Sequence, residues 1–147
     1  MMSAKKIVDE LTQKKNNLVK SFNPNTNYSF NFQDIKSFKK LKTVIVIGMG
    51  GSILGSKAIY NFLKPTKKNF VFIDDYLSKN FKSQNKNLNI IISKSGNTLE
   101  TISNFNILRK KNDQNIFITE NKDSYLMRVA NKLKADVVHH HNFIGGR

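Results

Sequence analysis

The sequence contains no cysteine and little proline or glycine. Among its 147 residues, two are proline and seven are glycine. The absence of cysteine fits a reducing compartment, and it excludes disulfides, thiolate catalysis and cysteine-ligated zinc. No apolar run approaches the roughly 20 residues that a membrane-spanning helix needs, and residues 1–8 lack the apolar core and cleavage site of a signal peptide. We therefore expect a cytoplasmic protein with no membrane partner.

Acidic residues are also scarce. Ten Asp and Glu stand against 25 Lys and Arg, which gives a net charge of +15. Such a charge is typical of proteins that bind nucleic acid. However, the lysines are scattered through every segment, and arginine, the usual reader of bases, occurs only at positions 109, 128 and 147. We predict no nucleic-acid partner, and instead a general attraction for small anionic substrates.

The first 42 residues differ in pattern from the rest. Ile7, Leu11, Leu18 and Phe22 recur near multiples of the helical turn, which predicts an amphipathic helix over residues 4–21. Residues 23–33 are rich in turn formers, and a short second helix is expected over 34–41. We interpret residues 1–42 as a helical N-terminal segment that docks on a core domain.

Residues 43–147 alternate short apolar runs with segments of helical periodicity. The runs predict strands at 43–47, 69–73, 88–92, 115–119 and 135–139. The longest helix is expected over 98–111. This alternation indicates an α/β domain, a flavodoxin-like doubly wound sheet of five parallel strands in the order 2-1-3-4-5. In such a sheet, ligands bind beyond the carboxyl ends of the strands, where the strand order reverses.

The first candidate site is the stretch GMGGSILG at 48–55, which follows the first strand and opens a helix. Its glycines allow close approach to a ligand, and the free N–H groups of a helix start favour an anion. Ser52 is expected to add a hydroxyl at the N-cap. The simpler interpretation is that Ser52 only caps the helix while the glycines only turn the chain.

Two familiar phosphate loops fit this stretch poorly. A Walker A loop needs Gly-Lys followed by Ser or Thr, whereas Gly55 is followed by Ser56 and then Lys57. A dinucleotide fingerprint needs glycine where Ile53 stands. Two acids near the end of the second strand, Asp74 and Asp75, keep dinucleotide binding as a minor alternative.

The second candidate site is SKSGNTLET at 93–101, which follows the third strand. Ser93, Ser95 and Thr98 can donate hydrogen bonds to one phosphate, and Lys94 supplies positive charge. Alone, the stretch could be an ordinary polar loop with Thr98 or Asn97 as N-cap. Because the first and third strands are neighbours in the expected order, both stretches converge on one spot. Together they predict a site for a phosphate monoester.

These stretches resemble the sugar isomerase (SIS) domain of glucose-6-phosphate isomerases, and the GGR segment at 145–147 strengthens the likeness. The resemblance implies that Gly51 and Ser52 contact the sugar phosphate. It also implies that Ser93, Ser95 and Thr98 hold the phosphate, with Lys94 in the same loop. The family often has threonine where Asn97 stands. No cofactor and no metal are implied.

The resemblance further implies two catalytic residues. Arg147 matches an arginine that stabilises an enediolate-type intermediate between glucose 6-phosphate and fructose 6-phosphate. Glu100 matches a motif glutamate near the sugar, although an acid in the first turn of a helix is also favoured by the helix dipole. The family is typically homodimeric.

The proton-transfer residues of the family, a glutamate, a histidine and a lysine, lie in a second SIS domain beyond residue 147. The three histidines at 139–141 sit at a strand end with side chains that alternate in direction, so we do not expect them to substitute. We therefore expect a truncated enzyme that binds the sugar phosphate without turnover. Its missing half would leave apolar surface exposed around Val137, Val138, Phe143 and Ile144. The alternative is a non-catalytic phosphosugar-binding module of the SIS type.

Overall fold

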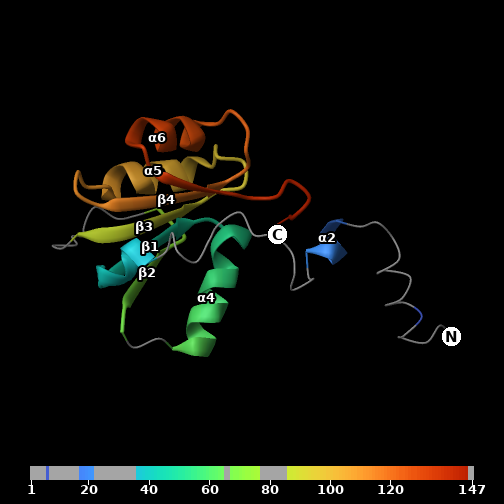
Figure 1. The fold of residues 1–147 in the computed structure, drawn as a ribbon, viewed down its shortest axis with the longest axis horizontal. Coiled ribbons are helices and arrows are strands. Elements are labelled where there is room, and N and C mark those ends of the chain that lie inside the picture. The colour runs from blue at the N-terminus through green and yellow to red at the C-terminus, as the bar shows by residue number, and fades with distance from the viewer. Residues whose placement is uncertain (1–5, 7–16, 22–35, 65–66, 77–85, 146–147) are drawn as a thin grey trace.

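One five-stranded parallel sheet organises the chain. The computed structural model describes residues 6, 17–21, 36–64, 67–76 and 86–145. The strands are β1 (Thr43–Gly48), β2 (Asn69–Ile73), β3 (Asn87–Ile92), β4 (Gln114–Thr119) and β5 (Asp136–His139). Their order is β2-β1-β3-β4-β5, and every neighbouring pair is parallel (Figure 1). The predicted doubly wound α/β fold and strand order are confirmed.

Helices cover both faces of this sheet. Helix α4 (Gly51–Leu63) lies on one face, while α5 (Leu99–Leu108) and α6 (Tyr125–Leu133) lie on the other (Figure 1). Each helix follows a strand, so each helix begins at the edge where the strands end. In the described part of the chain, no helix is long and apolar enough to span a bilayer.

The core is divided by the sheet into two apolar clusters. On the side of α5 and α6, Ile45 and Ile47 of β1 pack with Phe105 and Phe117, whose rings meet edge to face with centroids 5.2 Å apart. On the side of α4, the alternate β1 residues Val44 and Val46 pack with Ile53 and Phe38. Because both faces of β1 are covered, its residues 44–47 are apolar without interruption. Burial of each such side chain contributes about 1.5–3 kcal/mol.

Two helix predictions need correction. The helix expected over 98–111 ends at Leu108, and the longest described helix is α4, with 13 residues. Beyond α5 the chain turns, because the Asp113 carboxylate accepts the N–H groups of Lys110 at 3.1 Å and Asn87 at 2.9 Å. This carboxylate favours a turn by accepting backbone N–H groups from just beyond the end of α5 and from the start of β3.

The N-terminal predictions fall mostly outside the described residues. Of the helix expected over 4–21, a turn of α-helix, α2 (Asn17–Lys20), is described, and the loop at 23–33 lies outside. The second short helix is a 3-10 helix, η1 (Lys36–Lys40). Its Phe38 is 6% exposed, within the cluster beneath α4. The domain boundary at residue 42 stays a prediction.

Candidate functional site

The two predicted loops meet at one edge of the sheet. Gly48 ends β1 and pairs with Ile92, which ends β3. A Cβ atom added at Gly48 would lie 3.0 Å from the Ile92 carbonyl oxygen and 3.4 Å from the Ser52 Cβ. Glycine is therefore needed at this position because β3 and the start of α4 both approach it closely. Ser52 and the end of β3 consequently both lie beside Gly48.

The start of α4 differs from the prediction in one detail. Gly50, with φ of 52°, is the N-cap, so Ser52 is the second residue of the helix and not its cap. The Ser52 N–H donates to the Met49 carbonyl at 3.1 Å. Among the described residues, its half-buried hydroxyl has no hydrogen-bond partner. The hydroxyl is therefore placed at a helix N-terminus without being used as a cap.

The loop after β3 gathers three hydroxyls. Ser93 Oγ lies 2.9 Å from Thr98 Oγ1, and Ser95 Oγ lies 3.5 Å from each of them. Ser93 is buried, Thr98 is half-buried and Ser95 is exposed. Backbone N–H groups close the loop, because Gly96 donates to Ser93 Oγ at 3.1 Å and Asn97 donates to Ser95 Oγ at 3.2 Å. The predicted convergence of Ser93, Ser95 and Thr98 is thus present.

Gly96 shapes this loop and brings it against α6. It has φ of 68°, and an added Cβ would lie 2.2 Å from Ser124 Oγ and 2.9 Å from Thr119 Oγ1. Position 96 therefore excludes any side chain. The first N–H groups of α6 donate to this loop, Tyr125 to the Asn97 side-chain oxygen at 2.9 Å and Leu126 to the Gly96 carbonyl at 3.0 Å.

Asn97 thus has a function that sequence reasoning missed. Its side chain accepts the N–H that begins α6, while Ser124 caps the same helix by accepting the Met127 N–H at 3.3 Å. Such caps satisfy N–H groups that lack an acceptor within the helix. The N-cap of α5 is Thr98, whose side chain makes no capping bond and instead contacts Ser93.

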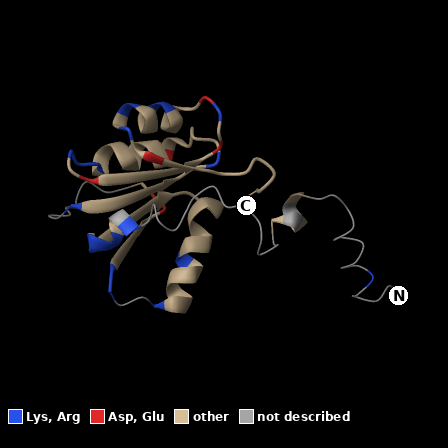
Figure 2. Ribbon diagram, in the orientation of Figure 1, with Lys and Arg blue, Asp and Glu red and all other residues tan. Residues whose placement is uncertain are grey.

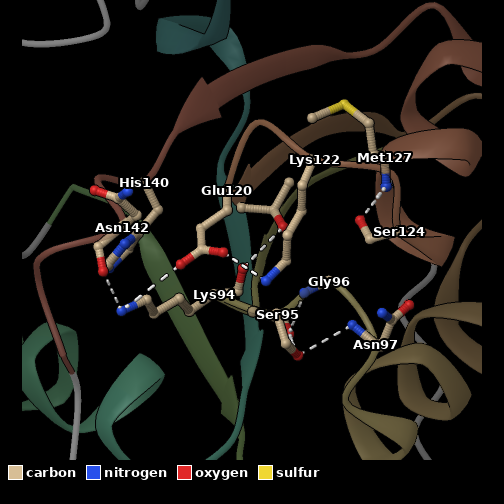
Figure 3. Close-up of polar contacts among 12 residues, drawn as sticks. Lys94, Ser95, Gly96, Asn97, Glu120, Lys122, Ser124, Met127, His140 and Asn142 are labelled. Carbon is tan, nitrogen blue, oxygen red and sulfur yellow. Dashed lines mark hydrogen bonds and ion pairs between the residues drawn. The ribbon is translucent and has the colours of Figure 1, made fainter.

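Lys94, which is predicted to supply charge to the phosphate, contacts the backbone after β5 in this structure. Its Nζ donates to the backbone carbonyl of Asn142 at 2.8 Å (Figure 3) and to that of Ile144 at 2.6 Å. It also lies 3.6 Å from a Glu120 carboxylate oxygen. The ammonium is therefore directed toward the segment that follows β5. This contact could not be found from the sequence, because 48 residues separate Lys94 from Asn142.

Glu120 is shared by two lysines at the end of β4. Lys122 Nζ lies 2.5 Å from its second carboxylate oxygen. This hydrogen bond from Lys122 lowers the pKa of Glu120, and the charges of Lys122 and Lys94 act in the same direction, while desolvation opposes them. The carboxylate consequently stays ionised near neutral pH and balances the ammonium of Lys94.

The remaining predicted residues lie as follows. Gly51 is exposed at the start of α4, and Glu100 is half-buried in the first turn of α5. Arg147 lies outside the described residues. Asp74, the candidate ribose ligand of the dinucleotide alternative, forms an ion pair with Lys57 of α4.

The three histidines do not form a common site. His139 and His141 are exposed, whereas His140 is half-buried and donates its backbone N–H to the Thr119 carbonyl at 2.8 Å. The His141 ring stacks on Phe143, with centroids 5.1 Å apart. Within the described ranges, no group of three or more histidine, aspartate or glutamate side chains could hold a metal ion.

The fold and the site define a doubly wound α/β domain that offers two helix N-termini and a cluster of hydroxyls at the carboxyl edge of its sheet. Doubly wound α/β domains bind ligands at that edge, and helix N-termini there favour anions. The family model of the SIS domain matches residues 37–145, and the chain belongs to the SIS domain family.

The comparisons also give named relatives. The chain is 42% identical over 90 residues to glucose-6-phosphate isomerase of Methanocaldococcus jannaschii, covering 57% of this chain and 22% of the relative. It is 31% identical over 167 residues to glucose-6-phosphate isomerase of Borrelia garinii, covering 95% of this chain and 32% of the relative. The chain therefore spans a third or less of the length of these relatives. Among solved structures, NanR of Vibrio vulnificus complexed with ManNAc-6P matches with a TM-score of 0.58 and 20% identity, over 77% of this chain and 42% of the other.

Proposed function

We propose that this chain provides the sugar-phosphate-binding part of a glucose-6-phosphate isomerase, which interconverts glucose 6-phosphate and fructose 6-phosphate. The relatives from Methanocaldococcus jannaschii and Borrelia garinii that carry this name support the assignment. The observation that carries it is the cluster of Ser93, Ser95 and Thr98 hydroxyls in the loop after β3, a strand whose last residue pairs with Gly48 ahead of α4. We further propose, from the same assignment to glucose-6-phosphate isomerase, that the protein acts in the cytoplasm, in glycolysis and gluconeogenesis. We also propose that it is a homodimer and needs no cofactor.

In this proposal the phosphate is held from two sides. Gly51 and Ser52 offer the N-terminal end of α4, while Ser95 and Thr98 offer hydroxyls from the loop before α5. Helix N-termini carry a partial positive charge and N–H groups without helical acceptors, so both favour a phosphate. Ser93 is 1% exposed and orients the hydroxyl of Thr98 at 2.9 Å. Binding thus relies on oriented donors more than on a lysine placed beside the phosphate.

The chemistry requires more than a phosphate site. Isomerisation moves a proton between adjacent carbons through an enediolate, which needs a base and stabilisation of negative charge. We assign the charge stabilisation to Arg147, and we place Glu100 near the sugar. We assign the base to none of these 147 residues, so we propose that they bind the sugar phosphate without turnover.

A second candidate is a phosphosugar-binding module that catalyses no reaction. The NanR protein complexed with ManNAc-6P, which shares the fold, supports this candidate. Reading the coding DNA past Arg147 separates the two candidates. A frame that continues into a second domain supports the isomerase, whereas a stop codon followed by a folded product supports the module.

Calorimetric titration of the chain with fructose 6-phosphate tests the proposed binding. We expect saturable binding, and no binding of fructose, which lacks the phosphate. Ser95→Ala removes one donor and is expected to weaken the affinity by about tenfold, the value of a hydrogen bond to a charged group.

The matched control is Ser56→Ala. The Ser56 hydroxyl donates to the Ile53 carbonyl at 2.7 Å within α4, and its loss is expected to leave the affinity unchanged. Equal affinity for fructose and fructose 6-phosphate would contradict the proposed function. So would equal effects of the two substitutions.

A further inference from the structure

The loop after β3, residues 93–98, is called the phosphate loop below. Lys94 joins this loop to the backbone that follows β5. Its Nζ donates to the Asn142 carbonyl at 2.8 Å and lies 3.6 Å from a Glu120 carboxylate oxygen (Figure 3), and it also donates to the Ile144 carbonyl at 2.6 Å. An ammonium group has three N–H donors and no acceptor. The two carbonyls therefore account for two of the donors, and the Glu120 carboxylate forms an ion pair with the same ammonium. A phosphate bound directly by Lys94 would have to compete with these contacts.

The backbone of Lys94 makes a second connection. Its carbonyl accepts the Glu120 N–H at 3.2 Å and the Thr119 hydroxyl at 3.4 Å. The Thr119 carbonyl in turn accepts the His140 N–H at 2.8 Å. The ends of β3, β4 and β5 are thus linked through Lys94 and the residues that it contacts.

We propose that Lys94 is a positioning residue that holds residues 140–145 against the phosphate loop, so that occupation of the loop and order in this segment are coupled. The effect on ligand binding rests on the proposed function, but the positioning itself does not. Arg147 follows the segment by two residues in the sequence, so the coupling ties phosphate binding to the stretch that carries the proposed charge-stabilising residue.

Two properties of the site support positioning over direct contact. Residues 141–143 are exposed, so the Lys94 side chain supplies two of the contacts that fix a segment with little burial of its own. Glu120, held by Lys122 at 2.5 Å, places a negative charge beside the ammonium. A carboxylate here favours a lysine that binds carbonyls, and it would repel a phosphate placed at the same ammonium.

Amide hydrogen exchange of the 147-residue chain, without ligand, tests the positioning. Lys94→Met keeps most of the aliphatic stem and removes the ammonium. We expect exchange at residues 141–145 to accelerate by about tenfold, the equivalent of losing one hydrogen bond to a charged donor. Lys94→Arg restores a cation and is expected to recover part of the protection.

The control is Lys122→Met, which removes the shorter contact to Glu120. It leaves the bonds from Lys94 to the carbonyls of Asn142 and Ile144 in place. We expect it to change exchange at 141–145 by less than about twofold, since both carbonyl bonds remain. If Lys94→Met does not fold, Lys94→Gln, which retains one donor group, takes its place with the same expectation. Unchanged exchange at 141–145 in a folded Lys94 variant would overturn the proposal.

Fructose 6-phosphate separates this inference from the proposed function. In the unsubstituted chain it is expected to slow exchange at 141–145, and in Lys94→Met this slowing should be lost while binding weakens less than about tenfold. Loss of binding with unchanged exchange would instead show a direct phosphate contact and overturn the positioning role. If the unsubstituted chain does not bind fructose 6-phosphate, the proposed function fails, while faster exchange in Lys94→Met without ligand still supports positioning.

Discussion

The hydroxyls of Ser93, Ser95 and Thr98 come from six consecutive residues, and Gly96 allows that short stretch to close. The left-handed backbone at Gly96, with φ of 68°, directs its N–H to Ser93 Oγ at 3.1 Å. It also leaves room for Ser124, which approaches the glycine where other residues carry a Cβ. The arrangement of donors therefore depends on a residue that contributes no side chain.

Substitution of Gly96 by alanine is expected to destabilise the fold by about 3 kcal/mol or more, because backbone strain and overpacking against Ser124 add together. Gly55→Ala is the matched control. Gly55 lies inside α4, and a Cβ there would meet nothing within 4 Å, so this change is expected to stabilise by about 0.5–1 kcal/mol. Urea unfolding of both variants measures the difference. Equal effects would contradict the role of Gly96.

Glu120 gives the site a pH dependence whose sign follows from its pKa. The hydrogen bond from Lys122 lowers that pKa below the ordinary value of 4.5. Stabilisation by the ionised carboxylate is therefore complete above pH 4.5 and is lost as the pH falls through the lower pKa of the folded state. The difference in unfolding free energy between the unsubstituted chain and Glu120→Gln should shrink in acid, as measured by urea unfolding from pH 7 to pH 3. A difference that grows in acid would show the opposite sign.

Helix α6 is the element most closely connected to the phosphate loop. Ser124 caps it, and Asn97 and Gly96 accept the N–H groups of Tyr125 and Leu126. A helix start satisfied by three acceptors has a fixed position relative to them. The loop and α6 therefore support each other across 28 residues of sequence between Asn97 and Tyr125.

Ser124→Ala is expected to lower the free energy of unfolding by about 1 kcal/mol through loss of this cap. Ser124→Gly provides the comparison, because glycine at an N-cap costs only a few tenths of a kcal/mol. Urea unfolding of the two variants measures the gap between them. A larger loss for glycine than for alanine would show that the hydroxyl does not act as a cap.

At the scale of elements, the strands were largely predictable from sequence, because strands that are buried on both faces of a parallel sheet consist mainly of apolar residues. The prediction of β2 at 69–73 is confirmed, and those of the other strands differ by a residue at one end. The end of α5 was not predictable, because the apolar periodicity over 98–111 carries no information about the Asp113 carboxylate. This carboxylate accepts backbone N–H groups and so favours a turn.

The site was predictable where its parts are local. Ser93, Ser95 and Thr98 lie within six residues, so their convergence follows from the turn. The contact of Lys94 with Asn142 and Ile144 depends instead on where β5 ends, which no local pattern encodes. The N-cap of α4 was predicted at Ser52 and lies two positions earlier, at Gly50.

Across the whole molecule, charge is distributed unevenly between the two edges of the sheet. Each strand is preceded within three residues by a lysine, namely Lys42, Lys68, Lys86, Lys111 and Lys134. Because all five strands are parallel, these lysines gather at the edge where the strands begin, opposite the candidate site (Figure 2). The helices end at this edge, and cations stabilise helix C-termini. Charges scattered along the sequence are thus brought together by the topology.

The double substitution Lys110→Gln and Lys111→Gln tests how far this charge acts. A strand of six residues separates the edges by about 20 Å, more than twice the screening length of about 8 Å in 0.15 M salt. We expect the affinity for fructose 6-phosphate to change by less than about twofold at that salt concentration. A tenfold fall in this affinity, measured by calorimetry, would show that the edge where the strands begin contributes to the site.

Exposed apolar side chains are distributed differently from the prediction. Val137, Val138 and Ile144 are half-buried and Phe143 is 38% exposed, whereas Phe62 on α4 is 87% exposed. Val137 packs against the core cluster on the side of α5 and α6, which explains its partial burial. The expected association through residues 137–144 stays a prediction.

The central claim is that the start of α4 and the loop before α5 bind one phosphate. The most direct measurement is an NMR titration of the amide-labelled chain with fructose 6-phosphate. We predict the largest shifts at Ser52, Ser95 and Thr98, all saturating with a single dissociation constant. Shifts confined to one of the two loops, or shifts that saturate at different concentrations, would contradict the claim.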